Sequence, residues 1–368
     1  MTRVLHVLWN GDIGGAERAV FQLALHQRRA GRVAAEIGFA QASGHYYDRA
    51  RETGIPVVDF ALRSGRDLMA LRHATPILAA YDVHHFHAPE LVLMLASLRT
   101  SATCIYTHRA GRAAYRGRRA LRYRILGRLL RRFDAITGSG QATSAMHDLY
   151  GIPRDRIYTT FNGIDPVVIA PRRSPTDVRA DFGFSQDAVL VGTAGRLREW
   201  KRVDALIEAA GALRPGQWRV VVIGDGPDRG RLERVAHESL ARGRIHFVGM
   251  QPEIGDWLSA LDVFVLAAGP EESFGNAAVE AMAAGLPTIV FGDSPALTEH
   301  IIDGKTGFVV GTPGELAQRL EELIDDRALR EHVGTAAATF ALNRYPMKRV
   351  VDRFDAVYAS AREARIRS

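Results

Sequence analysis

Short apolar runs recur along the whole chain, and stretches with helical spacing follow them. Val4 to Leu8 precedes a helical pattern over residues 15–30, Ala188 to Val191 precedes one over 203–213, and Val220 to Ile223 precedes one over 229–240. This alternation predicts an α/β chain, because parallel strands need long crossover connections, usually helices that cover both faces of the sheet. Further strand candidates are too many for one ordinary sheet: residues 57–60, 83–86, 102–106, 135–137, 157–161, 245–248, 263–266, 288–291 and 307–310.

The length of 368 residues allows two domains of ordinary size, each with its own core. A boundary is predicted at Pro166 to Pro175, where three prolines remove backbone donors and disfavour a continuous helix or a central strand. We therefore expect an N-terminal domain over residues 1–165, a linker over 166–175 and a C-terminal domain over 176–345. Apolar residues recur at helical spacing from Val350 to Val357, which predicts a final helix over 346–368 that packs back toward the N-terminal domain.

The positive charge of the chain is local. Of its 48 basic residues, ten are arginines between Arg109 and Arg132, a stretch without any acid, so 38 remain elsewhere against 41 acidic residues. This distribution disfavours a general nucleic-acid-binding surface, although the sequence pI near 9.8 alone would suggest one. We keep nucleic-acid binding only as a minor alternative.

Cysteine content and the N-terminus point to a cytoplasmic protein. Cys104 is the one cysteine, so it cannot form an intramolecular disulfide, and Met1 to Leu8 resembles a strand rather than a secretory signal. No apolar run approaches the roughly 20 residues that span a bilayer. We expect a cytoplasmic location, with peripheral attachment to the inner face of the plasma membrane as an open alternative.

The segment from Gly269 to Pro287 carries the strongest chemical signal. It predicts a strand, a loop, an alanine-rich helix over 276–284 that Ser273 caps, and a stop at Gly285 and Pro287. The helix N-terminus would then face the carboxyl edge of a parallel sheet, where backbone amides near Phe274, Gly275 and Asn276 could hold a phosphate. Two carboxylates, Glu272 in the loop and Glu280 in the helix, could contact an elongated ligand; the alternative is an ordinary acidic helix N-terminus.

Glu272 and Glu280, in the frame ESFGNAAVEAMAAGLP, resemble the signature of retaining glycosyltransferases of the GT-B fold, glycosyltransferase family 4. The resemblance continues in the order of that family over nearly the whole chain, through the segments 14–18, 82–87, 107–108, 151–165, 195–201 and 223–227. It implies two Rossmann-like domains that face each other across a cleft. It also implies a nucleotide-diphosphate sugar as donor and an acceptor hydroxyl.

The resemblance assigns roles to individual residues. It implies that Glu280 binds the ribose hydroxyls of the donor, that Glu272 faces the donor sugar, and that His108 stabilises charge at the reacting centre. Arg196 and Lys201 match a pair that neutralises the diphosphate, which is sensible because charge grows on the leaving group as the glycosidic bond breaks. The remaining expected donor contacts are Gly14, Gly15, Gly195, Met250, Ser273, Phe274, Gly275 and Asn276.

Neither a metal nor an organic cofactor is expected. His84, His85 and His87 are close enough in sequence to suggest zinc, but strand alternation points His84 to the opposite face, and the family keeps this pattern without metal. The chain also lacks an Asp-x-Asp motif for Mn²⁺ or Mg²⁺ on a diphosphate. Gly224 to Gly230 has the wrong spacing for the dinucleotide fingerprint, and no P-loop is present.

The arginine-rich stretch predicts a helix with an apolar stripe through Leu121, Ile125, Leu129 and Phe133. Its cations, among them Arg118, Arg119, Arg122, Arg124 and Arg128, suggest a patch for anionic lipid headgroups or for a phosphorylated, lipid-linked acceptor. The alternative is a solvated helix in a protein rich in arginine.

We therefore predict a metal-independent, retaining glycosyltransferase that acts on a cell-surface glycan, a lipid-linked or a natural-product acceptor. A sugar-nucleotide epimerase or a phosphorylase of the same architecture is the nearest alternative among enzymes. The sequence leaves the sugar, the base and the acceptor open.

Overall fold

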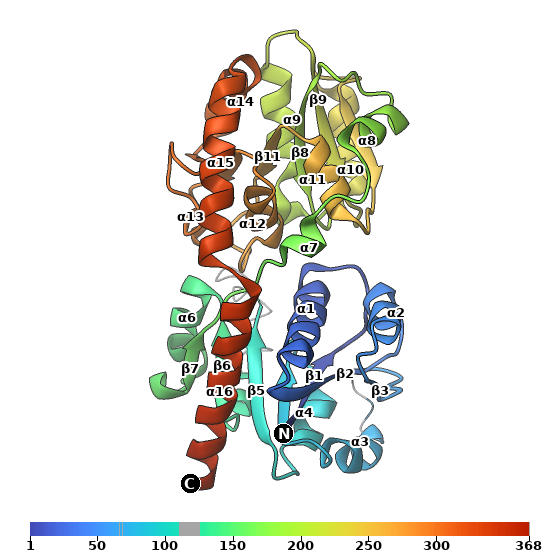
Figure 1. Ribbon diagram of the computed structural model, residues 1–368, viewed down its shortest axis with the longest axis vertical. Helices are drawn as coiled ribbons and strands as arrows, with labels where there is room; N and C mark the ends of the chain where they lie inside the picture. Colours follow the sequence, from blue (N-terminus) through green and yellow to red (C-terminus); the bar gives the residue numbers. More distant parts are fainter. Residues whose placement is uncertain (66, 68, 110–125, 368) are drawn as a thin grey trace. The chain divides into compact units, whose positions relative to one another are not determined.

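The computed structural model describes residues 1–368 except 66, 68, 110–125 and 368. The chain forms two compact units (Figure 1). The first consists of Met1–Gly163 with Met347–Ser368, and the second of Ile164–Pro346. The chain thus passes between the units at Gly163–Ile164 and at Pro346–Met347, and the expected linker over 166–175 lies within the second unit.

The described part of the first unit contains a seven-stranded, all-parallel sheet in the order β3-β2-β1-β4-β5-β6-β7. Its strands are β1 (Thr2–Leu8), β2 (Val33–Phe39), β3 (Val57–Asp59), β4 (Val83–Phe86), β5 (Thr103–His108), β6 (Ala135–Gly138) and β7 (Ile157–Thr159). Its helices are α1 (Gly15–Ala30), α2 (His45–Glu52), α3 (Ala70–Leu78), α4 (Leu91–Ser97), α6 (Gly140–Tyr150) and α16 (Met347–Arg367), with the 3₁₀ turn η2 (Arg154–Arg156).

The second unit contains a six-stranded parallel sheet in the order β10-β9-β8-β11-β12-β13. Its strands are β8 (Val189–Ala194), β9 (Trp218–Ile223), β10 (Ile245–Gly249), β11 (Val263–Leu266), β12 (Thr288–Phe291) and β13 (Phe308–Val310). Its helices are α7 (Pro166–Ile169), α8 (Pro175–Asp181), η3 (Glu199–Lys201), α9 (Val203–Ala212), α10 (Arg229–Glu238), α11 (Ile254–Ala260), α12 (Asn276–Ala283), α13 (Pro295–Thr298), α14 (Pro313–Asp325) and α15 (Arg327–Arg344).

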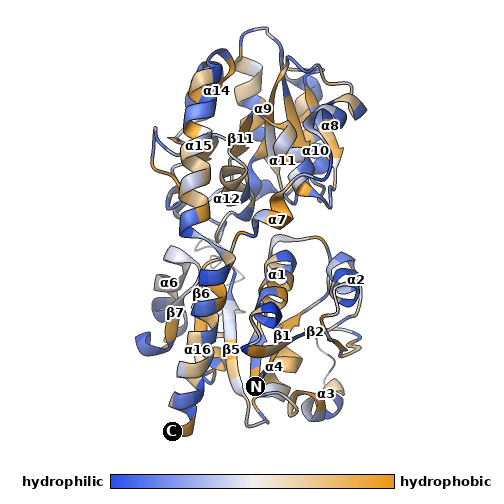
Figure 2. Ribbon diagram, viewed as in Figure 1, coloured by the Kyte–Doolittle hydropathy of each residue, from blue (hydrophilic) through white to orange (hydrophobic). Residues whose placement is uncertain are grey.

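Each sheet is buried on both faces. Each of the two faces of the first sheet packs against its own apolar cluster, and so does each face of the second sheet. Because successive side chains point to opposite, equally buried faces, the strands are continuous apolar runs rather than alternating ones. Helices such as α1 and α14 carry both hydrophobic and hydrophilic residues (Figure 2), as helices that cover a sheet do. Among the described residues, no helix has the length and apolar character needed to cross a bilayer.

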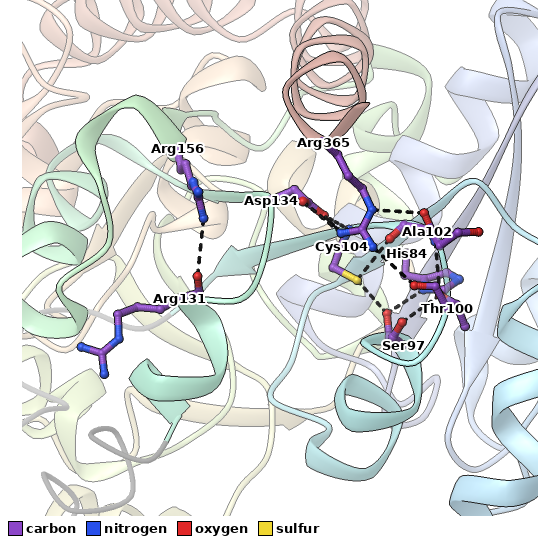
Figure 3. Close-up of polar contacts among 10 residues, drawn as sticks. His84, Ser97, Thr100, Ala102, Cys104, Arg131, Asp134, Arg156 and Arg365 are labelled. Atoms are coloured by element: carbon purple, nitrogen blue, oxygen red, sulfur yellow. Dashed lines mark hydrogen bonds and ion pairs between the residues drawn. The ribbon is translucent and has the colours of Figure 1, made fainter. Parts of the chain in front are cut away.

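The final helix, α16, completes the core of the first unit. Val350, Val351, Phe354 and Val357 are buried in the same apolar cluster as strands β1 and β2. Near its C-terminal end, Arg365 pairs with Asp134 at 3.2 Å, and the same carboxylate accepts the backbone amide of Cys104 at 2.8 Å (Figure 3). This contact joins α16 to the connection between β5 and β6.

Candidate functional site

The strand order of the second unit places its candidate site. From β8 the chain adds β9 and β10 on one side and then β11 to β13 on the other, so the strand order reverses between β8 and β11. In open parallel sheets, ligands bind at such a switch point, beyond the carboxyl ends of the strands. Gly195, Arg196 and Lys201 follow β8, whereas the loop 267–275 follows β11. A small pocket at this edge is lined by Gly195, Arg196, Lys201 and Leu266, together with Thr193, Ala194, Leu197, Val203 and Ile223.

Lys201 and Glu272 form a buried ion pair at this edge. Nζ of Lys201 donates to Oε2 of Glu272 at 2.6 Å, and the two side chains are only 15% and 9% exposed. Burial alone would raise the pKa of Glu272, but the Lys201 ammonium and the amides of Ser273 and Phe274 outweigh it and hold that pKa below its ordinary range. Glu272 is therefore a carboxylate at neutral pH and can only accept hydrogen bonds.

The loop before α12 is folded around this carboxylate. Oε1 of Glu272 accepts the amide of Ser273 at 3.0 Å and that of Phe274 at 3.5 Å. The prediction that Ser273 caps the helix is wrong, because the N-cap is Gly275 and no side chain caps it. Of the amides predicted to hold a phosphate, Glu272 thus engages that of Phe274, together with the amide of Ser273.

Gly275 is required by the backbone of the turn. Its φ of +81° lies in the left-handed region, and a Cβ at this position would collide with Leu297. The helix that follows has its N-terminus at Asn276 and carries Glu280 one turn further along, where the side chain is partly buried. Glu272 thus precedes the helix start and Glu280 lies within the helix, and contact of both with an elongated ligand stays a prediction.

A chain of hydrogen bonds through His300, Tyr345 and Arg344 also holds this loop, and the sequence analysis did not predict it. His300 is fully buried, and its Nε2 donates to the carbonyl of Phe274 at 2.6 Å. Its Nδ1 must then accept, and the hydroxyl of Tyr345 donates to it at 2.6 Å while accepting from Nε of Arg344 at 2.8 Å. Burial lowers the pKa of His300 to about 4, so the ring is neutral at pH 7.

The remaining predicted residues of the second unit occupy different places. Gly195 has a φ of +145° and is exposed beside Lys201, and Arg196 is exposed as well. Met250, 42% exposed, follows β10, the edge strand two positions away from β8. The structure therefore brings Arg196 and Lys201 to the switch point but leaves Met250 at the side of the sheet.

In the first unit, the switch point lies between β1 and β4. Gly14 is the N-cap of α1 and Gly15 its first residue, so both follow β1 as predicted from sequence. His108 is the last residue of β5 and is buried, and burial lowers its pKa to about 3. At neutral pH it is an uncharged imidazole that can donate a hydrogen bond but carries no positive charge.

His6, His85 and His87 form a buried cluster whose ring nitrogens lie within 4.8 Å of one another. These nitrogens already have partners: His87 bonds to His6 at 3.0 Å, His6 to Gln27 at 2.8 Å, and His85 to Tyr358 at 2.8 Å and Thr107 at 2.6 Å. The guanidinium of Arg109 also lies against His87 at 3.1 Å. A cation beside fully engaged imidazoles makes this cluster a poor fit for a metal ion.

His84 lies outside this cluster. It bonds instead to Ser97, which also contacts Cys104 (Figure 3).

Most of the predicted arginine patch, namely Arg118, Arg119, Arg122 and Arg124, lies outside the described residues. Arg128 is described and exposed, with Leu129 and Leu130 buried beside it. Contact with anionic lipid or with a phosphorylated acceptor stays a prediction for this stretch.

Comparison with known protein families gives two adjoining matches. Residues 13–168 match the model described as Glycosyltransferase Family 4, and residues 176–340 match that described as Glycosyl transferases group 1. Curated relatives include the lipopolysaccharide core biosynthesis mannosyltransferase LpsB of Rhizobium meliloti (strain 1021), 34% identical over 54% of this chain, and the N-acetyl-alpha-D-glucosaminyl L-malate synthase of Bacillus anthracis, 26% identical over 61%. The matched stretches span only 56% and 59% of those two relatives.

Solved structures resemble the chain over almost its full length. Anabaena Alr3699/HepE in complex with UDP-glucose has a TM-score of 0.87 at 21% identity, covering 98% of this chain and 100% of that chain. At this identity the similarity establishes the fold, which is GT-B.

Proposed function

Because the chain belongs to glycosyltransferase family 4 and has the GT-B fold, we propose that it transfers a sugar from a nucleotide-diphosphate sugar to an acceptor hydroxyl. The similar Anabaena structure is described as a complex with UDP-glucose, which supports a sugar nucleotide as donor. Neither matched family model describes an epimerase, a phosphorylase or a nucleic-acid-binding protein.

The observation that carries this proposal is the Lys201–Glu272 ion pair at the switch point of the second sheet. As the bond between sugar and diphosphate breaks, negative charge grows on the leaving group, and preorganised cations stabilise it. Lys201 is held in one position by Glu272, and exposed Arg196 lies on the same loop. We infer that these two cations replace a divalent metal on the diphosphate.

We further propose that transfer retains the anomeric configuration. Glu272 stays ionised because its pKa is low, so it would accept hydrogen bonds from sugar hydroxyls rather than donate a proton. His108, neutral at pH 7, would donate a hydrogen bond near the reacting centre. In this mechanism the acceptor attacks on the face that the diphosphate leaves, and the departing phosphate takes the acceptor proton. Glu280 would bind the ribose.

A test begins with the donor. Thermal unfolding is measured with UDP-, GDP- and ADP-sugars in the presence of EDTA, because a ligand that binds the native state raises the apparent melting temperature. We expect one nucleotide class to give a selective increase without added metal. Absence of any increase, or an increase that requires Mg²⁺ or Mn²⁺, would contradict the donor site as proposed.

Transfer is then followed as release of nucleoside diphosphate, and the anomer of the product is assigned by NMR. Lys201→Ala and Glu272→Ala should each lower the rate by on the order of 10²-fold, the usual effect of removing one preorganised charge. Glu208→Ala, an exposed acid on α9, is the matched control and should transfer at the wild-type rate. Full transfer by Glu272→Ala, or an inverted product, would overturn the assignment.

A further inference from the structure

Arg109 occupies a distinctive position at the carboxyl edge of the first sheet. It directly follows His108, the last residue of β5, and its side chain reaches the residues that follow two other strands. Nη2 donates to Nδ1 of His87 after β4 at 3.1 Å, and Nη1 donates to Oδ1 of Asn162 after β7 at 3.0 Å. The guanidinium is thus fixed at the edge where parallel sheets bind ligands.

Both partners are uncharged, and the hydrogen bonds that continue from His87 have a defined donor-to-acceptor direction. Because arginine only donates, Nδ1 of His87 must accept, so its Nε2 carries a proton and donates to His6. His6 in turn donates to Gln27, whose amide donates to Asp355 on α16 at 3.1 Å. Burial holds the pKa of His87 well below its ordinary value, so the ring stays uncharged and its Nδ1 stays available to accept from Arg109. The chain orients the guanidinium without neutralising it.

Arg109 has no sufficient counter-charge among the residues that the structure describes. Its Nε is buried and makes no hydrogen bond to any of them. Burial lowers the pKa of Arg109 to about 10, and the attraction of Glu17 and Tyr106 does not offset that loss of hydration. The sequence that follows cannot supply an acid either, since Arg109 to Arg132 contains no aspartate or glutamate. A guanidinium that is desolvated between two uncharged partners is costly, and it is retained where a ligand brings the opposite charge.

We propose that Arg109 binds an anionic group of the acceptor, a phosphate or a carboxylate, and so selects acceptors that carry a negative charge close to the reacting hydroxyl. The inference rests on the proposed glycosyl transfer, because it assigns the acceptor side of that reaction. A guanidinium fork fits a planar carboxylate or two oxygens of a phosphate, and the N–H groups not engaged by His87 and Asn162 supply the donors. A neutral sugar acceptor would leave this charge unmatched.

The experiment separates the anion site from the donor site. The donor site is first filled with the nucleoside diphosphate that the thermal screen selects, and inorganic phosphate or malate is then titrated calorimetrically at constant ionic strength. For the wild type and for Arg99→Ala, which removes an exposed arginine of the same unit, we expect binding of at least one of the two anions. Arg109→Ala should weaken it at least tenfold, and Arg109→Lys, which keeps the charge but loses the fork, should weaken it by a smaller factor.

The outcomes are distinguishable. Phosphate binding without malate binding identifies a phosphorylated acceptor, and the reverse identifies a carboxylate. Equal anion binding by wild type and Arg109→Ala, or no anion binding by wild type, would overturn the inference even if the nucleoside diphosphate binds normally. Failure of the nucleoside diphosphate to bind would instead refute the proposed function. Arg109→Lys keeps the test valid if the alanine variant does not fold, which its circular dichroism spectrum would show.

Discussion

At the scale of single residues, the proposed donor site depends on one carboxylate that stays ionised although it is almost completely buried. Glu272 is 8% exposed, and it receives a charge-assisted bond from Lys201 and two backbone amides. Such bonds are roughly twice as strong as neutral ones, and removing one partner of a buried pair costs about 3–5 kcal/mol because the other charge stays behind. The pair therefore contributes to stability as well as to the proposed chemistry.

This predicts a specific pH dependence for Glu272→Gln. The folded-state pKa of Glu272 is depressed, so its contribution to stability is complete above its unfolded value of about 4.3 and is lost as pH falls through the lower folded value. Wild type should exceed the variant in free energy of unfolding at pH 7, and the difference should shrink below about pH 4. Urea unfolding of both proteins between pH 3 and 7 measures it, and a difference that does not change with pH would contradict the assignment.

At the scale of elements, a short buried relay supports the loop before α12. Arg344 and Tyr345 at the end of α15 hold His300, and His300 holds the carbonyl of Phe274. The rings of Phe274, His300 and Tyr345 also pack edge to face, with centroids 4.7–5.5 Å apart. The backbone carbonyl of Tyr345 accepts the amide of Ile164 at 2.8 Å, so the loop is connected to the residues where the chain enters and leaves the second unit.

We therefore expect Tyr345→Phe to weaken donor binding. The change removes one hydroxyl, leaves Nδ1 of His300 without its donor, and should cost about 1–2 kcal/mol, equivalent to roughly 5- to 30-fold in affinity if it acts fully on the loop. Calorimetric titration with the donor diphosphate measures it. The control is Tyr358→Phe, which removes the matching tyrosine bond to His85 in the first unit and should lower stability similarly without changing donor affinity.

The sequence predicted elements better than the contacts between them. Apolar runs marked most strands, but β2 was missed because Ala34, Ala35 and Gly38 have little strand preference; pairing with β1 and β3 forms it instead. Glu272 and Lys201 were found because each lies in a recognisable motif. His300 and Tyr345 were missed because their contacts join residues 26 and 45 positions apart, and no local pattern marks them.

At the scale of the whole molecule, buried neutral histidines are unevenly distributed. The pKa values of His6 and His84 fall to about 4 and that of His108 to about 3 through burial, and those of His85 and His87 lie well below their ordinary value; all five belong to the first unit. In the second unit, burial lowers the pKa of His300 to about 4 and lowers that of His246 by less. The first unit therefore carries most of the groups that must stay unprotonated for the fold to persist.

We expect the first unit to lose stability first in mild acid. Each lowered folded-state pKa means that the unfolded chain binds more protons below about pH 6.5, so stability is complete above that value and falls by up to about 1.4 kcal/mol per pH unit for each group toward pH 4. Hydrogen exchange at pH 7.5 and 5.5, corrected for intrinsic rates, should show greater loss of protection in β1, β4 and β5 than in β8, β9 and β11. His84→Asn should reduce this loss, whereas His73→Asn, an exposed control, should not.

The return of α16 to the first unit also determines the order in which the protein can be completed during synthesis. The second unit is one continuous stretch, Ile164–Pro346, but the apolar cluster under β1 and β2 includes Val350 through Ala361. The ribosome therefore synthesises every residue of the second unit before it makes α16, the last helix of the first unit. Although domains generally fold in the order of translation, here the core of the earlier-translated unit stays incomplete until α16 emerges, with only α1 and α2 of the described helices packed on that apolar cluster.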